Sequence, residues 1–294
     1  MIPKGKLIPV GGNEVRREVR ERTAEGRAGV QTRMEILHRI LTESKGEKTN
    51  IVIIPTASSI PQEIANDYVL AYKSLGVAKI DVLPIRLRNQ TDKPAHIERV
   101  KKADVVMFTG GDQRKLTVAF ADTTFLATLK ERYEKESDFV IAGTSAGAMA
   151  MSQVMIAGGD TLEAMFKSTT HTYEGLGLIE NAIIDSHFVI RGRFGRLAVA
   201  VAKYPSTIGV GLGEDTGVII TEGRYMEAIG SRLVTIFDAK EMGHSNLQVD
   251  KKGMVALENI NMHVFPRGYV FDLSSRRLTH IPQEQLYNDT VIVS

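Results

Sequence analysis

The chain has 294 residues, 43% of them hydrophobic, which is enough for a sizeable core in one large α/β domain or two smaller ones. Its 37 basic and 35 acidic side chains leave a net charge of only +2, which argues against a polyanion-binding surface and hence against nucleic acid as a partner. The absence of cysteine excludes disulfides, thiolate metal sites and a cysteine nucleophile. No apolar run approaches the ~18 residues of a membrane helix, and residues 1–10 lack a signal-peptide pattern. We therefore expect a soluble, cytoplasmic protein with no membrane partner.

Apolar runs and helical segments alternate through the first part of the chain. Strands are expected at residues 6–10, 50–55, 79–85 and 104–109, with helices at about 30–44, 61–75 and 94–101. Residues 50–55 are almost continuously apolar, which is typical of a strand covered on both faces. The β-α-β-α alternation predicts a mostly parallel, doubly wound sheet flanked by helices. Residues 13–27 are so highly charged that we expect a mobile surface loop there.

The sequence around Ser145 has the pattern of a nucleophile elbow. A short apolar run, 139–142, leads directly into G-T-S-A-G-A at 143–148 and a small-residue helix. A hydroxyl on such a strand-to-helix turn projects clear of the sheet, and Gly143 and Gly147 permit close backbone approach. The G-x-S-x-G pattern also arises by chance in glycine-rich chains, and a phosphate-binding loop is the alternative at this place. Because no Gly-Lys-Ser/Thr follows, we favour a nucleophilic serine.

Two backbone amides are candidates for an oxyanion hole. The N–H of Ala146 stands at the start of the expected helix, where amides lack intrahelical acceptors. The strand at 104–109 ends in G-G-D-Q at 110–113, and two glycines at a strand end allow the backbone to approach a ligand. We therefore predict Gly111 as the second donor, with a plain turn into a helix as the alternative.

The second half of the chain contains a long segment without periodicity and a set of short strands. Residues 156–180 are expected to form a lid or a binding loop. Strands are predicted at 181–185 and 206–212, with a helix at 191–204 between them. Short β runs at 216–221, 224–229 and 232–237 predict an antiparallel extension of the sheet, and weaker ones at 263–266, 268–273 and 277–281 predict edge strands or arms. With no repeat or linker, we predict one domain over 1–294, with a catalytic core at about 5–240 and a β-rich extension at about 241–294.

A serine nucleophile needs a general base, which in this chain means one of seven histidines. His187 directly follows a predicted strand, at the edge of the sheet where this architecture places its chemistry. His171, in the lid-like loop, is the second candidate. The other five lie within expected helices or in the weakly patterned C-terminal part. We predict His187 as the base, with a packed or exposed histidine of no catalytic role as the alternative.

The base in turn needs a carboxylate to fix its tautomer. Glu214 follows the next predicted strand and is our choice, with Asp185 and Asp215 as rivals. The resulting order of serine, histidine and acid differs from that of an ordinary α/β-hydrolase, where the acid precedes the histidine. In an esterase of that class the acid would be Asp160 or Glu163, and the G-G-D-Q strand end argues against it.

Three arginines follow the candidate base in R-G-R-F-G-R, at positions 191, 193 and 196. On a helix, Arg193 and Arg196 would share a face near the strand ends. Guanidinium groups there could bind carboxylates in a bidentate manner. A solvated basic face is the alternative interpretation.

The chain resembles the serine peptidase family that holds cyanophycinase and aspartyl dipeptidase. The resemblance rests on four motifs in order: G-G-D-Q at 110–113, G-T-S-A-G-A at 143–148, D-S-H-F with R-G-R-F-G-R-L at 185–197, and G-L-G-E-D at 211–215. It implies a fold similar to class I glutamine amidotransferases and a homodimer that needs no metal or cofactor. It also implies hydrolysis of multi-L-arginyl-poly-L-aspartate to β-aspartyl-arginine dipeptides.

By motif, the resemblance gives Ser145 as nucleophile, His187 as base and Glu214 as the orienting acid. It places these residues in the substrate pocket: Gln113, Asp185, Ser186, Arg191, Arg193 and Arg196. The family commonly has Gln where this chain has Ser186, and the shorter side chain could widen or re-specify the pocket. A β-aspartyl or isoaspartyl dipeptidase therefore remains an alternative, as does a non-catalytic, amidotransferase-like binding protein.

Overall fold

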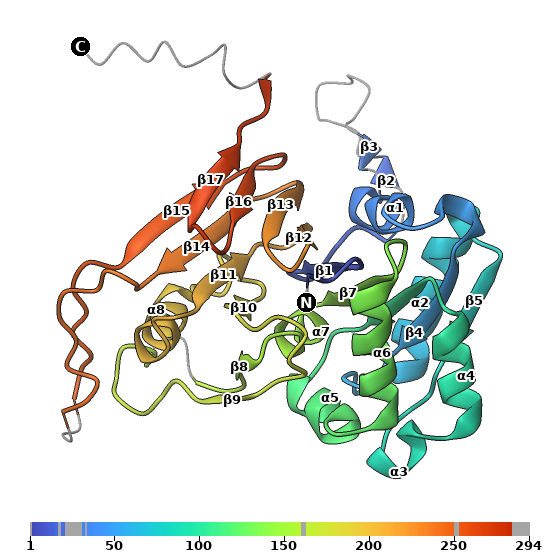
Figure 1. Cartoon of the computed structure of the whole chain (residues 1–294), viewed down its shortest axis with the longest axis horizontal. Coiled ribbons are helices and arrows are strands. Elements are labelled where there is room, and N and C mark those ends of the chain that lie inside the picture. The colour runs from blue at the N-terminus through green and yellow to red at the C-terminus, as the bar shows by residue number, and fades with distance from the viewer. Residues whose placement is uncertain are drawn as a thin grey trace.

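The computed structural model describes residues 2–16, 19–20, 31–32, 34–159, 163–249 and 253–283. Within these ranges the largest element is a nine-stranded sheet in the order β17-β16-β13-β12-β1-β7-β6-β4-β5 (Figure 1). The parallel half consists of β1 (Lys6–Val10), β7 (Val140–Thr144), β6 (Val105–Phe108), β4 (Asn50–Ile54) and β5 (Lys79–Val82). The predicted parallel sheet is therefore confirmed.

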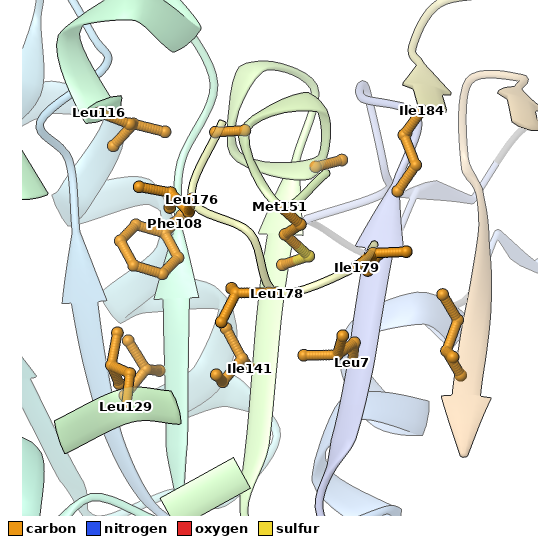
Figure 2. Close-up of a cluster of buried hydrophobic side chains, with 14 of the residues drawn as sticks. Leu7, Phe108, Leu116, Leu129, Ile141, Met151, Leu176, Leu178, Ile179 and Ile184 are labelled. Atoms are coloured by element: carbon orange, nitrogen blue, oxygen red, sulfur yellow. The ribbon is translucent and has the colours of Figure 1, made fainter. Parts of the chain in front are cut away.

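Helices cover both faces of the parallel half. They are α1 (Glu35–Thr42), α2 (Pro61–Ser74), α3 (Arg88–Thr91), α4 (Pro94–Lys102), α5 (Gln113–Phe120) and α6 (Thr124–Lys135), with a 3-10 turn at Gly46–Lys48. Alternate residues of β4 enter opposite cores: Ile51 and Ile53 pack with α1 and α2, whereas Val52 and Ile54 pack with α4, α5 and α6. This explains the continuous apolar run, because a strand covered on both faces has no solvent-exposed side. Figure 2 shows part of the second of these cores.

The other half of the sheet is antiparallel. It consists of β12 (Thr216–Thr221), β13 (Tyr225–Gly230), β16 (Val270–Asp272) and β17 (Arg277–His280), and β12 pairs with β1. The predicted antiparallel extension is confirmed for these strands. No helix in the described ranges is long and apolar enough to cross a membrane.

A second, four-stranded sheet carries much of the site. Its strands, in order, are β10 (Ala182–Asp185), β11 (Ile208–Leu212), β14 (Val234–Asp238) and β15 (Asn261–Phe265), and α8 (Phe194–Lys203) packs on it (Figure 1). Our expectation that the run at 232–237 would extend the main sheet is wrong, because β14 pairs with β11 and β15. Strand β12 occupies the edge of β1, so β10 and β11 pair with each other instead. The apolar pattern of a strand does not specify its partner, which is why the sequence did not reveal a second sheet.

Some observed helices and strands begin or end at other residues than the sequence predicts. The helix expected at 30–44 begins at Glu35, and the one expected at 191–204 begins at Phe194. The segment 156–180 contains β9 (Thr172–Glu174), which pairs with β8 (Val154–Ile156), and its residues 160–162 lie outside the described ranges. The charged segment 13–27 also lies largely outside them, apart from 13–16 and β2 (Val19–Arg20), which pairs with β3 (Gln31–Thr32).

Candidate active site

Ser145 occupies the sharp turn between β7 and α7 (Ala146–Ala150), with φ 51° and ψ −109°. Its backbone N–H donates to the carbonyl of Val10 at 2.8 Å, and its carbonyl accepts from the N–H of Met149 at 3.0 Å. The helix can start this close to the sheet because residue 147 is glycine: a Cβ there would lie 2.3 Å from the carbonyl oxygen of Phe108. The predicted strand-turn-helix geometry around this serine is therefore present.

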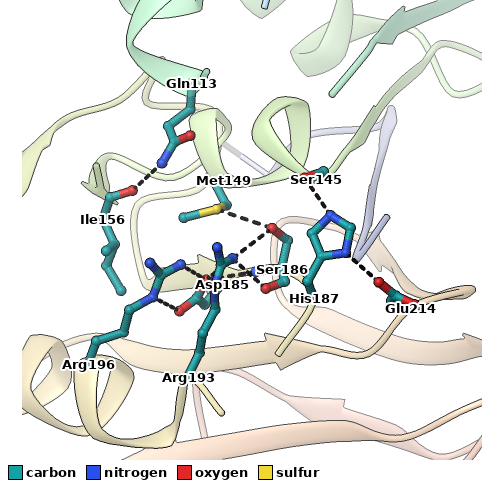
Figure 3. A network of polar contacts seen from close by, with 10 residues as sticks. All are labelled: Gln113, Ser145, Met149, Ile156, Asp185, Ser186, His187, Arg193, Arg196 and Glu214. Carbon is teal, nitrogen blue, oxygen red and sulfur yellow. Dashed lines mark hydrogen bonds and ion pairs between the residues drawn. The ribbon is translucent and has the colours of Figure 1, made fainter. Parts of the chain in front are cut away.

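The three residues predicted as a catalytic triad lie in one hydrogen-bonded chain (Figure 3). Ser145 Oγ is 2.9 Å from His187 Nε2, and His187 Nδ1 is 2.8 Å from Glu214 Oε1. The serine comes from the main sheet, whereas the imidazole and the carboxylate follow β10 and β11 of the second sheet. With Nδ1–H donating to the carboxylate, Nε2 accepts the hydroxyl proton, which is the arrangement of a nucleophile with its base.

The surroundings keep the imidazole neutral. Burial lowers the pKa of His187 below its ordinary 6.5, the hydrogen bond to Glu214 opposes this shift, and the charges of Arg191 and Arg193 add to it. The side chain of His187 is only 8% exposed, and that of Glu214 is 17% exposed. A neutral imidazole at neutral pH can take a proton, so the electrostatics suit a general base.

A short loop after β1, residues 11–14, supports the histidine and its acid and was not predicted to do so. The carbonyl of Gly11 accepts from the N–H of His187 at 2.8 Å. The Nδ2 of Asn13 donates to Glu214 Oε1 at 2.7 Å, so this oxygen receives two donors. The sequence contains a pattern that could have indicated this loop, because Gly11-Gly12 follows a predicted strand just as Gly110-Gly111 does.

Four non-glycine residues around the site have positive φ. They are Asn13 (48°), Ser145 (51°), His187 (47°) and Asp215 (47°). Such conformations are uncommon for L-residues and persist where neighbouring contacts over-determine them, often at functional sites. The backbone is therefore strained where the three side chains meet.

The glycine-rich end of β6 lies beside the serine. A Cβ on Gly110 would be 3.4 Å from the Cβ of Ser145, and Gly111, at φ 143°, packs against the backbone of Ala57. Within the described ranges the N–H of Gly111 has no hydrogen-bond acceptor, and Ala146 is the first residue of α7. Gly110 is therefore close to the serine, and the N–H groups of Gly111 and Ala146 stay predicted oxyanion donors.

Two of the three predicted pocket arginines, Arg193 and Arg196, bind a buried carboxylate (Figure 3). Asp185 is fully buried, and Arg196 binds it in a bidentate manner with Nε to Oδ2 at 2.5 Å. Arg193 also donates to it, with Nη1 to Oδ1 at 3.1 Å. These two side chains do not form a solvated basic face, whereas Arg191 is exposed. Since two guanidinium groups share one carboxylate, this part of the site has a net positive charge.

Arg193 is unusual within this group because its Nε is buried and has no partner among the described residues. Burial first, and then the charges of Arg196 and Arg191, lower its pKa to about 10 against the attraction of Asp185. It precedes α8 as its N-cap residue and does not lie on the helix, contrary to our expectation. It nevertheless remains a cation at neutral pH.

The two remaining pocket candidates, Gln113 and Ser186, are polar and have different partners (Figure 3). Gln113 is the first residue of α5, and its Nε2 donates to the carbonyl of Ile156 at 2.8 Å. Ser186 is buried between Asp185 and His187, and its Oγ lies 3.3 Å from the sulfur of Met149. The binding roles of Gln113 and Ser186 stay predictions.

Comparison with known proteins decides the family. The sequence model of Peptidase family S51 matches residues 23–228. The chain belongs to peptidase family S51. It is 35% identical over 249 residues to a cyanophycinase of Geminocystis herdmanii, covering 84% of this chain and 90% of that protein. It is also 34% identical to one of Trichormus variabilis (82% and 81% covered) and 28% identical to one of Synechococcus elongatus (94% and 82% covered).

Two solved structures have the same fold as this S51 peptidase. A peptidase from an acI-B1 actinobacterium superposes with a TM-score of 0.60 at 22% identity, covering 90% of this chain and 98% of that one. A peptidase E protein from Listeria monocytogenes gives a TM-score of 0.51 at 17% identity, covering 78% and 98%. The expected family and α/β fold class are confirmed, and the chain is a hydrolase.

The rival residues predicted for the base and the acid have other partners, are exposed, or lie outside the described ranges. Asp215 accepts from the N–H of Val15 at 3.1 Å and from Ser231 Oγ at 2.7 Å. His171 and Glu163 are exposed, and position 160 lies outside the described ranges. In the part of the chain that the structure describes, no three histidine or acidic side chains come together as metal ligands would.

Proposed function

We propose that this S51 peptidase is a serine-type, exo-acting hydrolase that cleaves multi-L-arginyl-poly-L-aspartate (cyanophycin) to β-aspartyl-arginine dipeptides. The observation that carries the proposal is the hydrogen-bonded chain from Ser145 through His187 to Glu214. Its similarity to proteins named cyanophycinase, at up to 35% identity, supports the choice of substrate.

The proposed mechanism is acyl transfer. His187 Nε2 removes the hydroxyl proton as Ser145 Oγ attacks the carbonyl carbon of an aspartyl peptide bond, and the N–H groups of Gly111 and Ala146 stabilise the oxyanion. The C–N bond then breaks as the imidazolium returns its proton to the leaving amine. Water, deprotonated by the same imidazole, hydrolyses the acyl-enzyme. Glu214 holds the tautomer and stabilises the imidazolium throughout.

The positive charge of the pocket fits a substrate that carries free carboxylates. Arg191 is exposed beside the imidazole, and Arg193 carries a buried N–H without a partner among the described residues. Both can bind the free α-carboxylates of the substrate, which orients the scissile bond. The amide of Gln113 supplies a further polar contact.

A β-aspartyl or isoaspartyl dipeptidase is the second candidate, and the residue at position 186 favours it. Ser186 is shorter than the Gln that the resemblance leads one to expect there, and its hydroxyl lies against Met149. The substrate pocket of this chain therefore differs in shape at one position next to the base.

The deciding experiment incubates the purified protein with cyanophycin and, separately, with β-aspartyl dipeptides, and identifies the products by mass spectrometry. We expect β-aspartyl-arginine from cyanophycin, no product from the Ser145→Ala variant, and unchanged activity in a control that replaces the exposed, distant Ser206 by alanine. Cleavage of dipeptides alone would select the second candidate. A wild-type protein that neither cleaves these substrates nor reacts with a fluorophosphonate would refute the proposed serine mechanism and substrate.

We also propose a homodimer, on the strength of the family resemblance. Sedimentation equilibrium of the purified chain measures this directly. A mass of one chain, 32.4 kDa, at all concentrations would contradict it.

A further inference from the structure

We propose that Glu14 is a positioning residue for the nucleophile, acting through the hydroxyl of Thr144. This inference rests on the proposed function. Glu14 is 4% exposed, and its Oε2 accepts a hydrogen bond of 2.7 Å from Thr144 Oγ1. Thr144 is itself 5% exposed and directly precedes Ser145 in the chain. The carboxylate therefore holds the residue from which the catalytic turn begins.

The second carboxylate oxygen of Glu14 is also occupied. Its Oε1 accepts from the hydroxyl of Tyr68, and burial first, then the charge of Glu14, holds the pKa of Tyr68 well above its ordinary value. Tyr68 therefore stays a donor over the whole working range of pH. Among the described residues no cation forms an ion pair with Glu14. Burying a carboxylate whose partners, among the described residues, are only hydroxyl groups costs folding free energy. We take this cost as a sign that Glu14 has a function at the turn.

The turn next to Glu14 has an uncommon backbone conformation. Ser145 has φ 51° and ψ −109°, a conformation that a side-chain-bearing residue adopts only when its surroundings impose it. Strand β1 and the loop after it impose it at two points. The carbonyl of Val10 accepts from the N–H of Ser145 at 2.8 Å, and four residues later Glu14 binds the side chain of Thr144.

The same loop also reaches the other two members of the proposed triad. Gly12 lies against the ring of His187, and Asn13 donates to the carboxylate of Glu214. Residues 11–14 thus contact His187, Glu214 and Thr144, the residue before the nucleophile. The assigned role is positioning, and the loss of a link should slow the chemical step while substrate affinity stays almost unchanged.

The test uses Thr144→Val, which removes the hydroxyl and keeps the shape of the side chain, and Thr144→Ser, which restores the hydroxyl. The matched control is Thr109→Val: Thr109 is also fully buried at the end of a neighbouring strand, but its Oγ1 has no partner among the described residues. For each variant we would measure the rate of fluorophosphonate labelling of Ser145, kcat and KM on cyanophycin, and Tm.

We expect Thr144→Val to lower kcat and the labelling rate about tenfold with little change in KM, because a small displacement of a nucleophile is costly. Thr144→Ser should recover most of the rate, and Thr109→Val should keep it. Glu14→Gln should lower kcat and the labelling rate by a similar factor. A double variant of Glu14→Gln and Thr144→Val should be no slower than either single one, because both break the same link.

If Thr144→Val and Thr109→Val had equal labelling rates and equal kcat, the positioning role would be overturned. The same holds if both variants lost activity in proportion to their loss of Tm. The labelling rates do not depend on which substrate the enzyme cleaves. Rapid labelling of the wild type without cleavage of cyanophycin would refute the proposed substrate alone, and the labelling rates would still test the role of Glu14. A wild type that is not labelled would overturn both proposals.

Discussion

The backbone of Gly12 lies directly against the imidazole of His187: a Cβ at position 12 would come within 2.5 Å of the ring atoms Cε1 and Nε2. Gly12 also has φ 106°, a region that L side chains rarely adopt. The plane of the imidazole is thus fixed by packing from one side as well as by its two hydrogen bonds. This contact orients Nε2 toward Ser145.

Replacement of Gly12 by alanine should therefore damage catalysis more than folding. The new methyl group would push the imidazole out of line with Ser145, and we expect kcat/KM to fall about 100-fold, in keeping with the cost of a displacement of ~1 Å. The control is Gly46→Ala, which also places alanine at a positive φ, 59°, but meets nothing within 4 Å. Steady-state kinetics and Tm of both variants test this. If activity falls only in proportion to Tm in both, the contact with the ring is unimportant.

Asn13 should act on the acid of the triad. Its Nδ2 shares Glu214 Oε1 with the imidazole, so Asn13→Ala should lower kcat about tenfold, and Asn13→Asp should lower it further because two carboxylates would then face each other. Asn259→Ala is a close control, since Asn259 is also exposed, has φ 61° and donates a 2.7 Å bond, to the carbonyl of Glu241. If Asn259→Ala proved as harmful as Asn13→Ala, or neither changed kcat, the link to Glu214 would have no role in catalysis.

The acid limb of the pH profile should reflect the lowered pKa of His187. Activity requires the neutral imidazole, so kcat/KM should rise with pH, and the midpoint of this rise should lie below 6.5, the ordinary pKa of histidine. Arg191→Gln removes a charge that lowers this pKa, and the midpoint should move to higher pH. Glu214→Gln removes a partner that raises it, and the residual activity should show a midpoint at lower pH.

The measurement is kcat/KM across pH 4 to 8, with Arg99→Gln as a control for an exposed arginine elsewhere. If Arg191→Gln moved the midpoint to lower pH, or Arg99→Gln moved it as far, the electrostatic account of His187 would be incorrect. A change in KM alone for Arg191→Gln would instead mark a role in binding.

The parts of the site that could be predicted depend on local patterns. The turn at Ser145 is specified by the glycines around it, and the parallel strands by their continuous apolar runs, so both follow from short stretches of sequence. His187 and Glu214 could be chosen because each follows a strand, although the strands belong to a second sheet that the pattern did not reveal. The division into a core and an extension at about residue 240 stays a prediction.

The parts that could not be predicted depend on pairings across the chain. Glu14 reaches Thr144 over 130 residues, and Asn13 reaches Glu214 over 201, and neither link has a local signature. The R-G-R-F-G-R motif predicts ligands for substrate, yet in the structure Arg196 binds Asp185. A sequence shows that charges of both signs lie near one another, but only the fold shows which pairs form.

The pairing of Asp185 with Arg193 and Arg196 yields a prediction about stability. All three side chains are at most 12% exposed, and removing the carboxylate would leave two buried cations without their anion. Asp185→Asn should therefore lower the free energy of unfolding by about 3 to 5 kcal/mol. The control is Asp112→Asn: Asp112 also binds an arginine, Arg114, but that side chain is 61% exposed, and the loss should stay under ~1 kcal/mol.

Urea unfolding at pH 7, followed by circular dichroism, measures both losses. A double variant, Asp185→Leu with Arg196→Met, should recover part of the stability, because an apolar pair replaces one buried ion pair while Arg193 stays without its anion. It should not recover activity, since the positive charge of the pocket falls and Arg193 loses its anchor. If Asp185→Asn and Asp112→Asn cost the same, the buried ion pairs do not hold this part of the site together. If the double variant were fully active, Asp185 and Arg196 would have no role in binding substrate.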